Sequence, residues 1–238
     1  MRILFVNDDG FEANGLQSLV RIFEKKHDCS VVAPRFEQSA KGHSFTMRET
    51  VILSELHEKK WTVSGTPADC VYVALHHLHC QPDVIISGIN QGTNLGTDIF
   101  YSGTVGAARE GALNSIRSFA VSTEPLENTL GFYDQISEEF FTLFEQLMLF
   151  PNGLYNVNVS TIPNAPVRMV PLGRRLYQNR VQETDCGLIL GGPPIGYEGE
   201  DTCDIASYQN GFTTVTPLSM DGTDHELLKN AGNSRLFS

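Results

Sequence analysis

The sequence predicts an α/β protein built on a doubly wound, mostly parallel sheet of Rossmann-like type, with a hairpin-rich extension at its C-terminal end. Three observations support this fold class. Short apolar runs alternate with stretches of helical periodicity over roughly the first 160 residues. Polar or glycine-rich segments directly follow several of these runs, as in folds whose ligands bind beyond the carboxyl ends of parallel strands. After Pro163 the alternation stops, and proline, glycine and short strand-like pieces dominate.

The core is expected to occupy residues 1–162. Its first helix is predicted at residues 13–26, where apolar side chains recur at helical spacing and two lysines stand at the end that the helix dipole favours. A second helix begins after Thr66, an N-cap residue that is followed by Pro67 at the first helical position and Asp69 at the third. The other core elements are predicted as strands at 3–6, 30–33, 83–86, 119–122 and 154–159, extended arms at 45–54 and 61–63, and helices at 104–114 and 133–149.

Residues 163–238 are expected to form the hairpin-rich extension. Glycine and proline cluster in GGPPIG at residues 191–196, and a short final helix is predicted near 224–230. Projections of this kind often mediate contacts between copies of a chain, so we expect a homodimer or homotetramer. The strand-like pieces of the extension are 167–170, 176–182 and 212–216.

The composition narrows the class of function and the expected compartment. Asp and Glu number 28 against 17 Lys and Arg, so the formal net charge of −11 disfavours stable binding to nucleic acid. No apolar run approaches the roughly 18 residues of a membrane span, and no signal peptide precedes the first strand, so no membrane association is expected. The five cysteines are widely spaced without a C-x-x-C pair, which indicates free thiols in the cytoplasm.

Oxygen-bearing side chains follow three of the predicted strands. Asp8 and Asp9 come directly after the first strand, Ser39 lies in the loop after the second, and Asn90 follows the strand DVIIS. These side chains should meet at one edge of a parallel sheet, where a hard cation such as Mg²⁺ or Mn²⁺ would find oxygen ligands and relieve the repulsion between the two aspartates. The alternative is that Asp8-Asp9-Gly10 is an ordinary polar turn.

A glycine-rich segment, SGINQGTNLGTDIFYSGTVGAAREG, occupies residues 87–111. It contains a second asparagine, Asn94, and runs into the helix that Thr104 is expected to open, with Ser102 and Thr104 as hydroxyl donors. Glycine lets the backbone approach an anion closely, and a helix N-terminus directs free N–H groups at it, so the segment is typical of a phosphate-binding loop. It is neither a Walker loop nor a Rossmann fingerprint, and the alternative is a long structural loop.

These motifs occur together in one known family. The chain resembles the survival protein SurE family, metal-dependent phosphatases that act on nucleoside monophosphates. The resemblance spans most of the chain and is strongest through residue 123. The segments that carry it are ILFVNDDG (3–10), VAPRFEQSAKGHSFT (32–46), VSGTPADCV (63–71), PDVIISGINQGTNLGTDIFYSGTVGAAREG (82–111), LYNVNV (154–159) and TTVTPL (213–218).

The resemblance implies a set of functional residues. The family's metal ligands fall on Asp8, Asp9, Ser39 and Asn90, the oxygen donors at the strand ends, and they would hold one divalent cation per subunit, Mg²⁺ or Mn²⁺. The residues that the family uses around the phosphate fall on Asn94 and on the segment Ser102-Gly103-Thr104. We interpret Asp8, Asp9 and Asn94 as the catalytic residues, with one of the two aspartates as the base that takes the proton of the attacking water; a covalent aspartyl-phosphate is the competing route.

Two positions in the second loop depart from the family. Arg35 places a positive charge where the family usually has an acid, and Ala40 replaces a glycine after Ser39. Ala40 would be strained if its position requires a positive φ. A single histidine in this loop, His43, is expected to lie on the surface, with a catalytic role as the alternative.

The function implied is a metal-dependent phosphomonoesterase, a 5′-nucleotidase of acid-phosphatase-like type. It would hydrolyse nucleoside 5′- and 3′-monophosphates, and short polyphosphate, through a metal-activated water. One alternative is a non-catalytic regulatory protein that binds a phospholigand. A nucleotide-dependent glycosyl or ligase domain is another, and it would require a second substrate. A serine hydrolase is disfavoured because no G-x-S-x-G elbow occurs.

Overall fold

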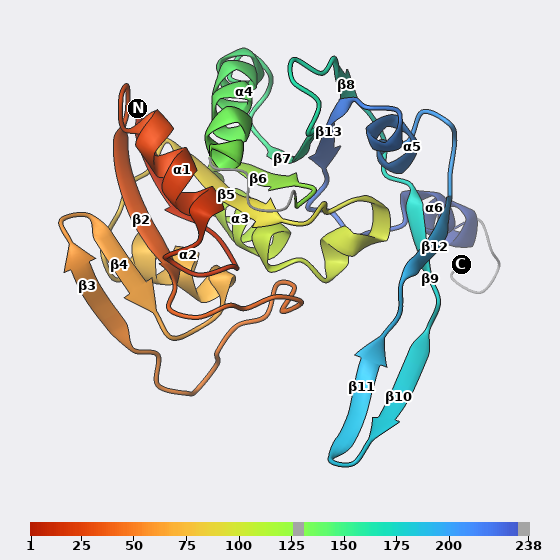
Figure 1. The fold of residues 1–238 in the computed structure, drawn as a ribbon, viewed down its shortest axis with the longest axis horizontal. Helices are drawn as coiled ribbons and strands as arrows, with labels where there is room; N and C mark the ends of the chain where they lie inside the picture. Colours follow the sequence, from red (N-terminus) through yellow and green to blue (C-terminus); the bar gives the residue numbers. More distant parts are fainter. Residues whose placement is uncertain (126–130, 233–238) are drawn as a thin grey trace.

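The computed structural model describes residues 1–125 and 131–232 (Figure 1). Within these residues the chain forms a nine-stranded sheet with the order β3-β4-β2-β1-β5-β6-β7-β13-β8. Its strands are β1 (Arg2–Val6), β2 (Asp28–Pro34), β3 (Leu53–His57), β4 (Lys60–Val63), β5 (Val84–Gln91), β6 (Arg117–Thr123), β7 (Leu154–Val159), β8 (Val167–Met169) and β13 (Thr213–Leu218).

The sheet is mostly parallel. Strands β4, β2, β1, β5, β6 and β7 pair in parallel from neighbour to neighbour, whereas β3 pairs antiparallel with β4 and β13 pairs antiparallel with β7. The predicted doubly wound fold class is therefore confirmed. The described helices are α1 (Asn14–Phe23), α2 (Pro67–His76), the 3-10 helix η1 (Gly96–Phe100), α3 (Gly103–Leu113), α4 (Phe132–Leu147), α5 (Asp204–Gln209) and α6 (His225–Gly232).

Helices cover both faces of the sheet, and strand β1 shows why. Ile3 and Phe5 point into the core beneath α1 and α4, while Leu4 and Val6 point into the core beneath α2 and α3 (Figure 1). Because successive side chains of a strand face opposite ways, a strand buried on both faces needs an unbroken apolar run. This requirement accounts for the run Ile3–Val6 with which the sequence begins.

The direction of winding reverses between β1 and β5. Strand β2 lies on one side of β1 and β5 on the other, with Phe5 paired to Val31 and to Ile86. Loops that leave β1 and β5 therefore diverge at the carboxyl edge of the sheet, and ligands of doubly wound folds bind at such a switch point. The two adjacent aspartates follow β1 directly.

Two helix starts test the sequence reading. The capping box of α2 is confirmed, since the Thr66 side chain accepts a hydrogen bond from the Asp69 N–H at 3.1 Å and Asp69 Oδ2 accepts one from the Thr66 N–H at 2.8 Å. The expected opening of α3 at Thr104 is wrong. Ser102 is the N-cap, because its Oγ accepts a hydrogen bond from the Val105 N–H at 3.1 Å, and the helix begins at Gly103.

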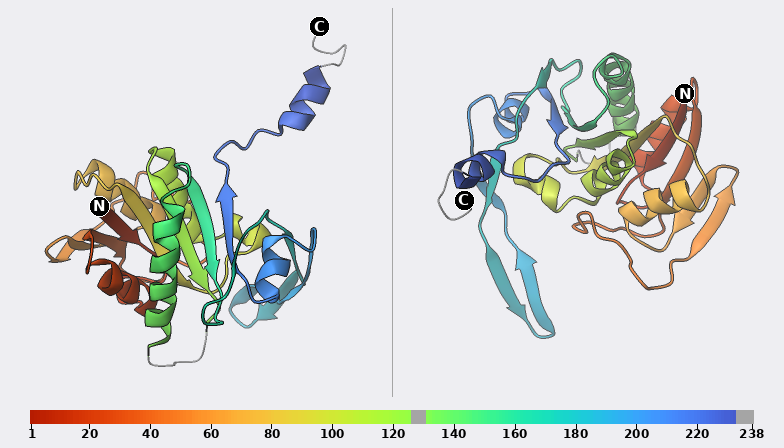
Figure 2. Two further views of the ribbon diagram at one scale, coloured as in Figure 1. Left: turned by 90° about the horizontal axis from the view of Figure 1, so that it is seen from above. Right: turned by 180° about the vertical axis from the view of Figure 1, so that it is seen from behind.

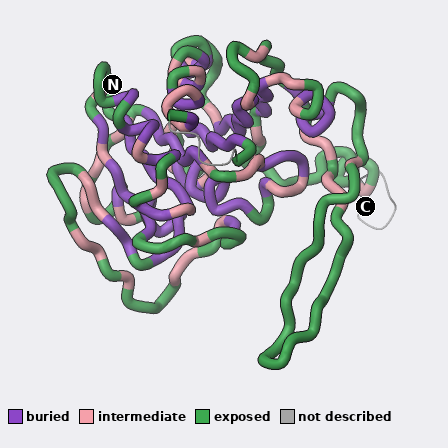
Figure 3. Tube along the Cα trace, viewed as in Figure 1, coloured by how far each residue is buried: buried purple, intermediate pink, exposed green. Residues whose placement is uncertain are grey.

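The C-terminal segment contributes to the main sheet and also forms a projecting arm. Strands β8 and β13 extend the sheet beyond β7, so it continues past residue 162. The arm consists of two antiparallel ladders, which are exposed along most of their length (Figures 1 and 3). Helix α6 projects from the body after β13 (Figure 2). The strands of the arm are β9 (Arg174–Tyr177), β10 (Arg180–Thr184), β11 (Gly187–Gly191) and β12 (Pro194–Glu198).

Several expected elements differ in extent. The single piece expected at 176–182 is divided between β9 and β10, because Gln178 and Asn179 lie between the two ladders. The extended arm expected at 45–54 becomes a strand only at Leu53, where antiparallel pairing with β4 begins. Strands β11 and β12 were not predicted, because glycine and proline interrupt their pattern, and helix α5 was not predicted because its six residues are too few for a clear helical periodicity.

Across the two described ranges, no helix is both long enough and apolar enough to cross a membrane.

Candidate active site at the switch point

Asp8 is buried beneath the N-terminus of α3. The Thr104 hydroxyl donates a hydrogen bond to Asp8 Oδ1, and only 3% of Asp8 is exposed. Gly103 makes this approach possible, since a Cβ at position 103 would lie 2.9 Å from the Cβ of Asp8. Burial raises the pKa of Asp8 above its ordinary value, and the hydrogen bond from Thr104 opposes that rise. The structure thus brings together three of the predicted site residues, Asp8, Gly103 and Thr104.

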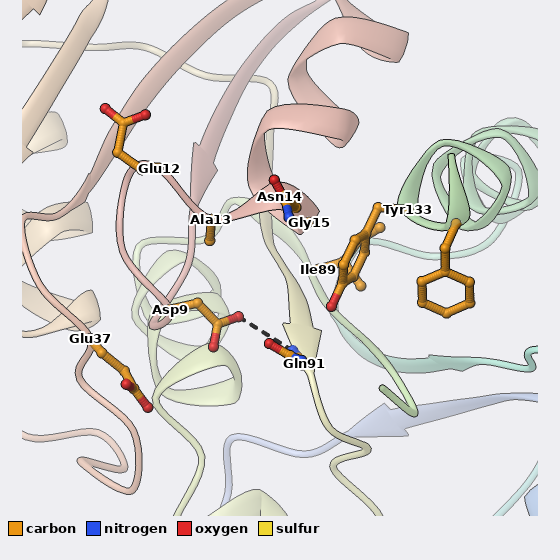
Figure 4. Close-up of a pocket in the computed structure, with 10 residues that line it drawn as sticks. Asp9, Glu12, Ala13, Asn14, Gly15, Glu37, Ile89, Gln91 and Tyr133 are labelled. Carbon is orange, nitrogen blue, oxygen red and sulfur yellow. Dashed lines mark hydrogen bonds between the residues drawn. The ribbon is translucent and has the colours of Figure 1, made fainter. Parts of the chain in front are cut away.

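Asp9 is half-buried, and its side chain points away from Asp8, toward the end of β5. Its Oδ2 accepts a hydrogen bond from the Gln91 backbone N–H at 3.3 Å, which joins the loop after β1 to the end of β5 (Figure 4). Burial, and then the charge of Asp8, raise the pKa of Asp9 to about 6. A positive charge beside the two aspartates would favour the ionised form of both.

The loop after β2 reaches the same edge. The Gln38 N–H donates to the Asp8 backbone oxygen at 2.8 Å, so this loop is tied to the turn that carries the aspartates. The exposed Ser39 donates its hydroxyl to Glu37 Oε1 at 2.8 Å. Ala40 has a φ of 58°, so it adopts the left-handed conformation in which strain was expected for an alanine.

His43 does not lie free on the surface, and that expectation is wrong. Its Nε2 lies 3.0 Å from Oε2 of Glu110, a buried residue of α3, and only 21% of the His43 side chain is exposed. The pair fastens the second loop to the flank of α3. The N–H of Gly42 donates to the Tyr101 carbonyl at 2.8 Å and adds a second attachment.

The two asparagines of the glycine-rich segment have different surroundings. Asn90 is half-buried and donates its side-chain amide to the Gly92 carbonyl at 2.7 Å, so Oδ1 is the atom that can ligate a cation. Asn94 is buried, and its amide donates to Ser122 Oγ at 2.8 Å. The structure therefore places Asn90 beside the Asp9–Gln91 contact and fastens Asn94 to β6.

Two residues that the sequence reading missed hold Asn94 in place. The side-chain amides of Asn156 and Asn158 both donate to the Asn94 carbonyl, at 2.8 and 3.0 Å, and Asn158 Oδ1 accepts from the Asn94 N–H at 2.8 Å. Both are buried on β7. The signal was present in LYNVNV, because two amides within a buried strand require partners.

A pocket of about 370 Å³ opens beside Asp9 at the switch point (Figure 4). Three carboxylates line it, from Asp9, Glu12 and Glu37, and no lysine or arginine is among its described lining residues. Tyr133 of α4 lines its far side, and burial together with the charge of Asp9 raises the pKa of the Tyr133 phenol. Sequence alone could not find Tyr133, since only the packing of α4 brings it here.

The oxygen atoms available to a cation come from three loops. They are the carboxylates of Asp8 and Asp9, the Ser39 hydroxyl and the Asn90 side-chain oxygen, a set of hard donors suited to Mg²⁺ or Mn²⁺. In the described part of the chain, no three acidic, histidine or cysteine side chains gather closely enough to hold a metal ion. A cation at this edge would therefore depend on the hydroxyl and amide oxygens as well as on the two carboxylates.

The fold is therefore that of a doubly wound α/β protein. Its candidate site lies at the carboxyl edge of the sheet, where paired carboxylates stand beside a helix N-terminus. The chain belongs to the survival protein SurE family, whose model, described as "Survival protein SurE", matches residues 3–179. That span contains all the residues discussed for the site.

Relatives and a solved structure agree with this membership. The chain is 38% identical to the 5′-nucleotidase SurE of Heliobacterium modesticaldum over 246 residues, which cover 96% of this chain and 90% of that protein. It is 34% identical to the 5′-nucleotidase SurE of Leptospira interrogans over 98% of each chain. The crystal structure of the SurE protein from Aquifex aeolicus has a TM-score of 0.85, with 31% identity, over 97% of this chain and 98% of that one.

Proposed function

We propose that this protein is a metal-dependent phosphomonoesterase that hydrolyses nucleoside 5′-monophosphates. Membership in the SurE family and relatives named 5′-nucleotidase SurE support the wider class, a phosphoric monoester hydrolase. Nucleoside 3′-monophosphates and short polyphosphate belong to the proposal as further substrates, because all of them present a terminal phosphoryl group to the same site.

The observation that carries the proposal is the acidic lining of the pocket beside Asp9. A phosphate group would meet the carboxylates of Asp9, Glu12 and Glu37 there, with no lysine or arginine among the described lining residues to offset them. The repulsion between anions at close range costs several kcal/mol at the low effective dielectric of a partly buried site. A divalent cation bound to the same carboxylates would offset this repulsion and attract the substrate.

Asp8, Asp9, Ser39 and Asn90 are the residues that we propose to hold this cation, one Mg²⁺ or Mn²⁺ per subunit. When bound, such an ion polarises a phosphoryl oxygen and lowers the pKa of water at the site. Thr104 orients the Asp8 carboxylate through its hydroxyl, and the Gln91 N–H orients Asp9. Both aspartates are thus held by groups outside the proposed ligand set.

The N-terminus of α3 is proposed to bind the phosphate. The dipole of the helix favours an anion at this end, where Ser102, Gly103 and Thr104 lie and where the Thr104 hydroxyl already donates to Asp8. Asn94, fixed by β6 and β7, is proposed to orient the glycine-rich loop around the phosphoryl oxygens. Such preorganised donors stabilise charge that develops in the transition state.

Asp9 is proposed as the base for the attacking water. Its side chain lines the pocket, whereas the Asp8 carboxylate is buried against Thr104. Of the two carboxylates, Asp9 is therefore the one that water can reach with substrate in the pocket. Asp8 is left to the binding of the cation and the orientation of α3.

The proposal includes the compartment and the assembly. All five cysteines are free thiols, which suits the reducing cytoplasm. The arm exposes apolar side chains on strands β10 and β11, including Val181, Leu188 and Leu190, at 60%, 63% and 76% exposure. Exposed apolar surface of this kind is typical of contacts between protein chains, so the arm supports a homodimer or homotetramer.

Phosphate release from a panel of nucleoside 5′- and 3′-monophosphates and tripolyphosphate, in EDTA, Mg²⁺ or Mn²⁺, tests the activity. We expect release that requires the metal and that falls at least about 100-fold in Asp9→Asn, because the variant loses a base and a cation ligand. The matched control is Asp201→Asn, which removes an exposed carboxylate outside the site and should leave release unchanged.

Full activity of Asp9→Asn would show that the site assignment is wrong. A folded wild-type protein that binds Mn²⁺ but releases no phosphate from any substrate would indicate the regulatory, phospholigand-binding alternative. In that case the strained Ala40 and the exposed Arg35 would be the first residues to revert to the family's pattern, Gly and Asp.

A further inference from the structure

We infer that a second pocket at the same edge of the sheet binds the nucleoside part of the substrate, an inference that rests on the proposed function. This nucleoside pocket has a volume of about 610 Å³, within the range of roughly 300–1,000 Å³ that is usual for small-molecule sites. The lining residues on which the argument depends are Thr93, Glu124, Ser160, Arg175, Ile195 and Tyr208.

The position of the nucleoside pocket is the first argument. Thr93, Glu124 and Ser160 follow the carboxyl ends of β5, β6 and β7, the edge at which ligands of doubly wound sheets bind. Gln91 lines the acidic pocket and Thr93 lines the nucleoside pocket. Only Gly92 separates them in sequence, so one short stretch of chain borders both pockets and a ligand could extend from one to the other.

The border between the two pockets is firmly held. The Gly92 N–H donates to the Thr123 carbonyl at 2.9 Å, and the Asn158 side chain fixes Asn94 next to it. On the far side, the Tyr208 hydroxyl accepts a hydrogen bond from the Glu124 N–H at 3.2 Å. Because these segments are already held by hydrogen bonds, they lose little conformational entropy when a ligand binds.

The charges of the lining indicate an uncharged ligand group. Arg175 is the one cationic residue among the described lining residues, and its guanidinium lies 3.2 Å from the Asp98 carboxylate. Both side chains are largely buried, at 17% and 14% exposure, and the Tyr177 hydroxyl donates to Asp98 at 2.9 Å. Because Asp98 neutralises Arg175 and Glu124 adds a negative charge, the pocket does not suit a second phosphate.

The remaining lining suits a nucleoside. Ile162 and Ile195, at 53% and 65% exposure, offer apolar surface to the faces of a planar ring. Threonine, serine and glutamine side chains offer hydrogen bonds to its edges and to sugar hydroxyls. The Glu124 carboxylate is an acceptor for O–H or N–H donors. Tripolyphosphate has none of these groups, so it gains nothing from this pocket.

The test compares a nucleotide with a phosphomonoester that has no nucleoside. We expect Ile195→Trp, which fills the pocket from the exposed strand β12, to lower kcat/KM for AMP at least about tenfold more than kcat/KM for p-nitrophenyl phosphate. Glu124→Gln should raise KM for AMP in the same selective way, without a change of shape. The matched control is Leu149→Trp, because Leu149 is 87% exposed and lies outside both pockets.

Equal effects on the two substrates, or none from either variant, would overturn the inference. Failure of the proposed function gives a different result, since the wild-type protein would then hydrolyse neither substrate. Binding of adenosine alone, measured by calorimetry on the full chain, tests the pocket independently of turnover. Wild type and Leu149→Trp should bind adenosine with equal affinity, and Ile195→Trp should bind it at least about tenfold more weakly. Unaltered binding in Ile195→Trp would reject the pocket.

Discussion

At the scale of the residue, neighbours in sequence can have opposite tasks. Asp8 is buried against Thr104, while Asp9 lines an acidic pocket and contacts Gln91. The sequence predicted that these two carboxylates would stand at the end of the first strand, because the apolar run ends there. It could not predict that one points toward α3 and the other toward β5, since that division depends on the packing of three loops.

Gly103 gives the sharpest steric prediction. A side chain at this position would press on Asp8 and would also lie 3.1 Å from the Pro67 ring. We expect Gly103→Ala to lower the free energy of unfolding by about 1–3 kcal/mol, measured by urea denaturation, and to reduce phosphate release through displacement of Asp8. Gly222→Ala is the control, because nothing lies within 4 Å of a Cβ there. Equal stability of the two variants would contradict the close approach.

Ala40 should respond in the opposite direction. Its φ of 58° costs an alanine roughly 1–2 kcal/mol, whereas glycine adopts this conformation freely. After the larger backbone entropy of glycine in the unfolded chain is deducted, Ala40→Gly should raise the free energy of unfolding by up to about 1 kcal/mol. Ala112→Gly, within α3, should lower it by about 1 kcal/mol. Thermal denaturation of both variants measures the contrast.

At the scale of the element, helices α1 and α4 pack together through aromatic rings. Phe23 contacts Phe140 and Phe144, with ring centroids 6.0 and 5.2 Å apart. His27 joins this cluster just after α1, and both of its ring nitrogens are buried without a hydrogen-bond partner among the described residues. The sequence predicted both helices from their apolar spacing, but it contained no sign that a histidine would be drawn into their contact.

His27 makes stability depend on pH. Burial lowers its pKa, as do the N-terminus and Lys26, while Glu145 opposes them. The folded state therefore binds the proton less readily than the unfolded state, in which histidine has a pKa near 6.5, so stability should fall as the pH drops below about 6.5. In His27→Leu this part of the fall should disappear, and in His57→Leu, at an exposed position, it should remain. Urea denaturation between pH 5 and pH 8 would decide, and identical pH profiles would exclude the mechanism.

At the scale of the whole molecule, the body and the arm contrast in how far sequence could predict them. The body follows rules of alternation and capping that act locally, and its resemblance to the SurE family was specific. The acidic pocket and the nucleoside pocket could not be predicted, because Tyr133, Arg175 and Tyr208 come from elements distant in sequence. Of the arm, the sequence predicted one strand-like piece at 176–182, which covers parts of β9 and β10, but it did not predict β11 and β12, where glycine and proline interrupt the pattern.

The arm carries the prediction for assembly. The double substitution of Leu188 and Leu190 by Asp places two charges on exposed apolar positions of β11. If the arm joins copies of the chain, the variant should have a smaller mass than wild type by light scattering after size exclusion. Leu149→Asp, at an exposed position outside the arm, should leave the mass unchanged. A wild-type protein with the mass of one chain would contradict the proposed oligomer.

The place of β13 in the sheet also affects how the chain folds during synthesis. Thr214 pairs with Asn158 and Val215 with Val157, so β13, which is synthesised more than 50 residues after β7, covers the edge of β7. Until residue 218 has left the ribosome, β7 presents an open edge that could pair with another nascent chain. Strand β7 also bears Asn156 and Asn158, which hold the glycine-rich loop through the Asn94 carbonyl. A chain that ends before Thr213 would therefore leave uncovered the edge of the strand that supports the glycine-rich loop.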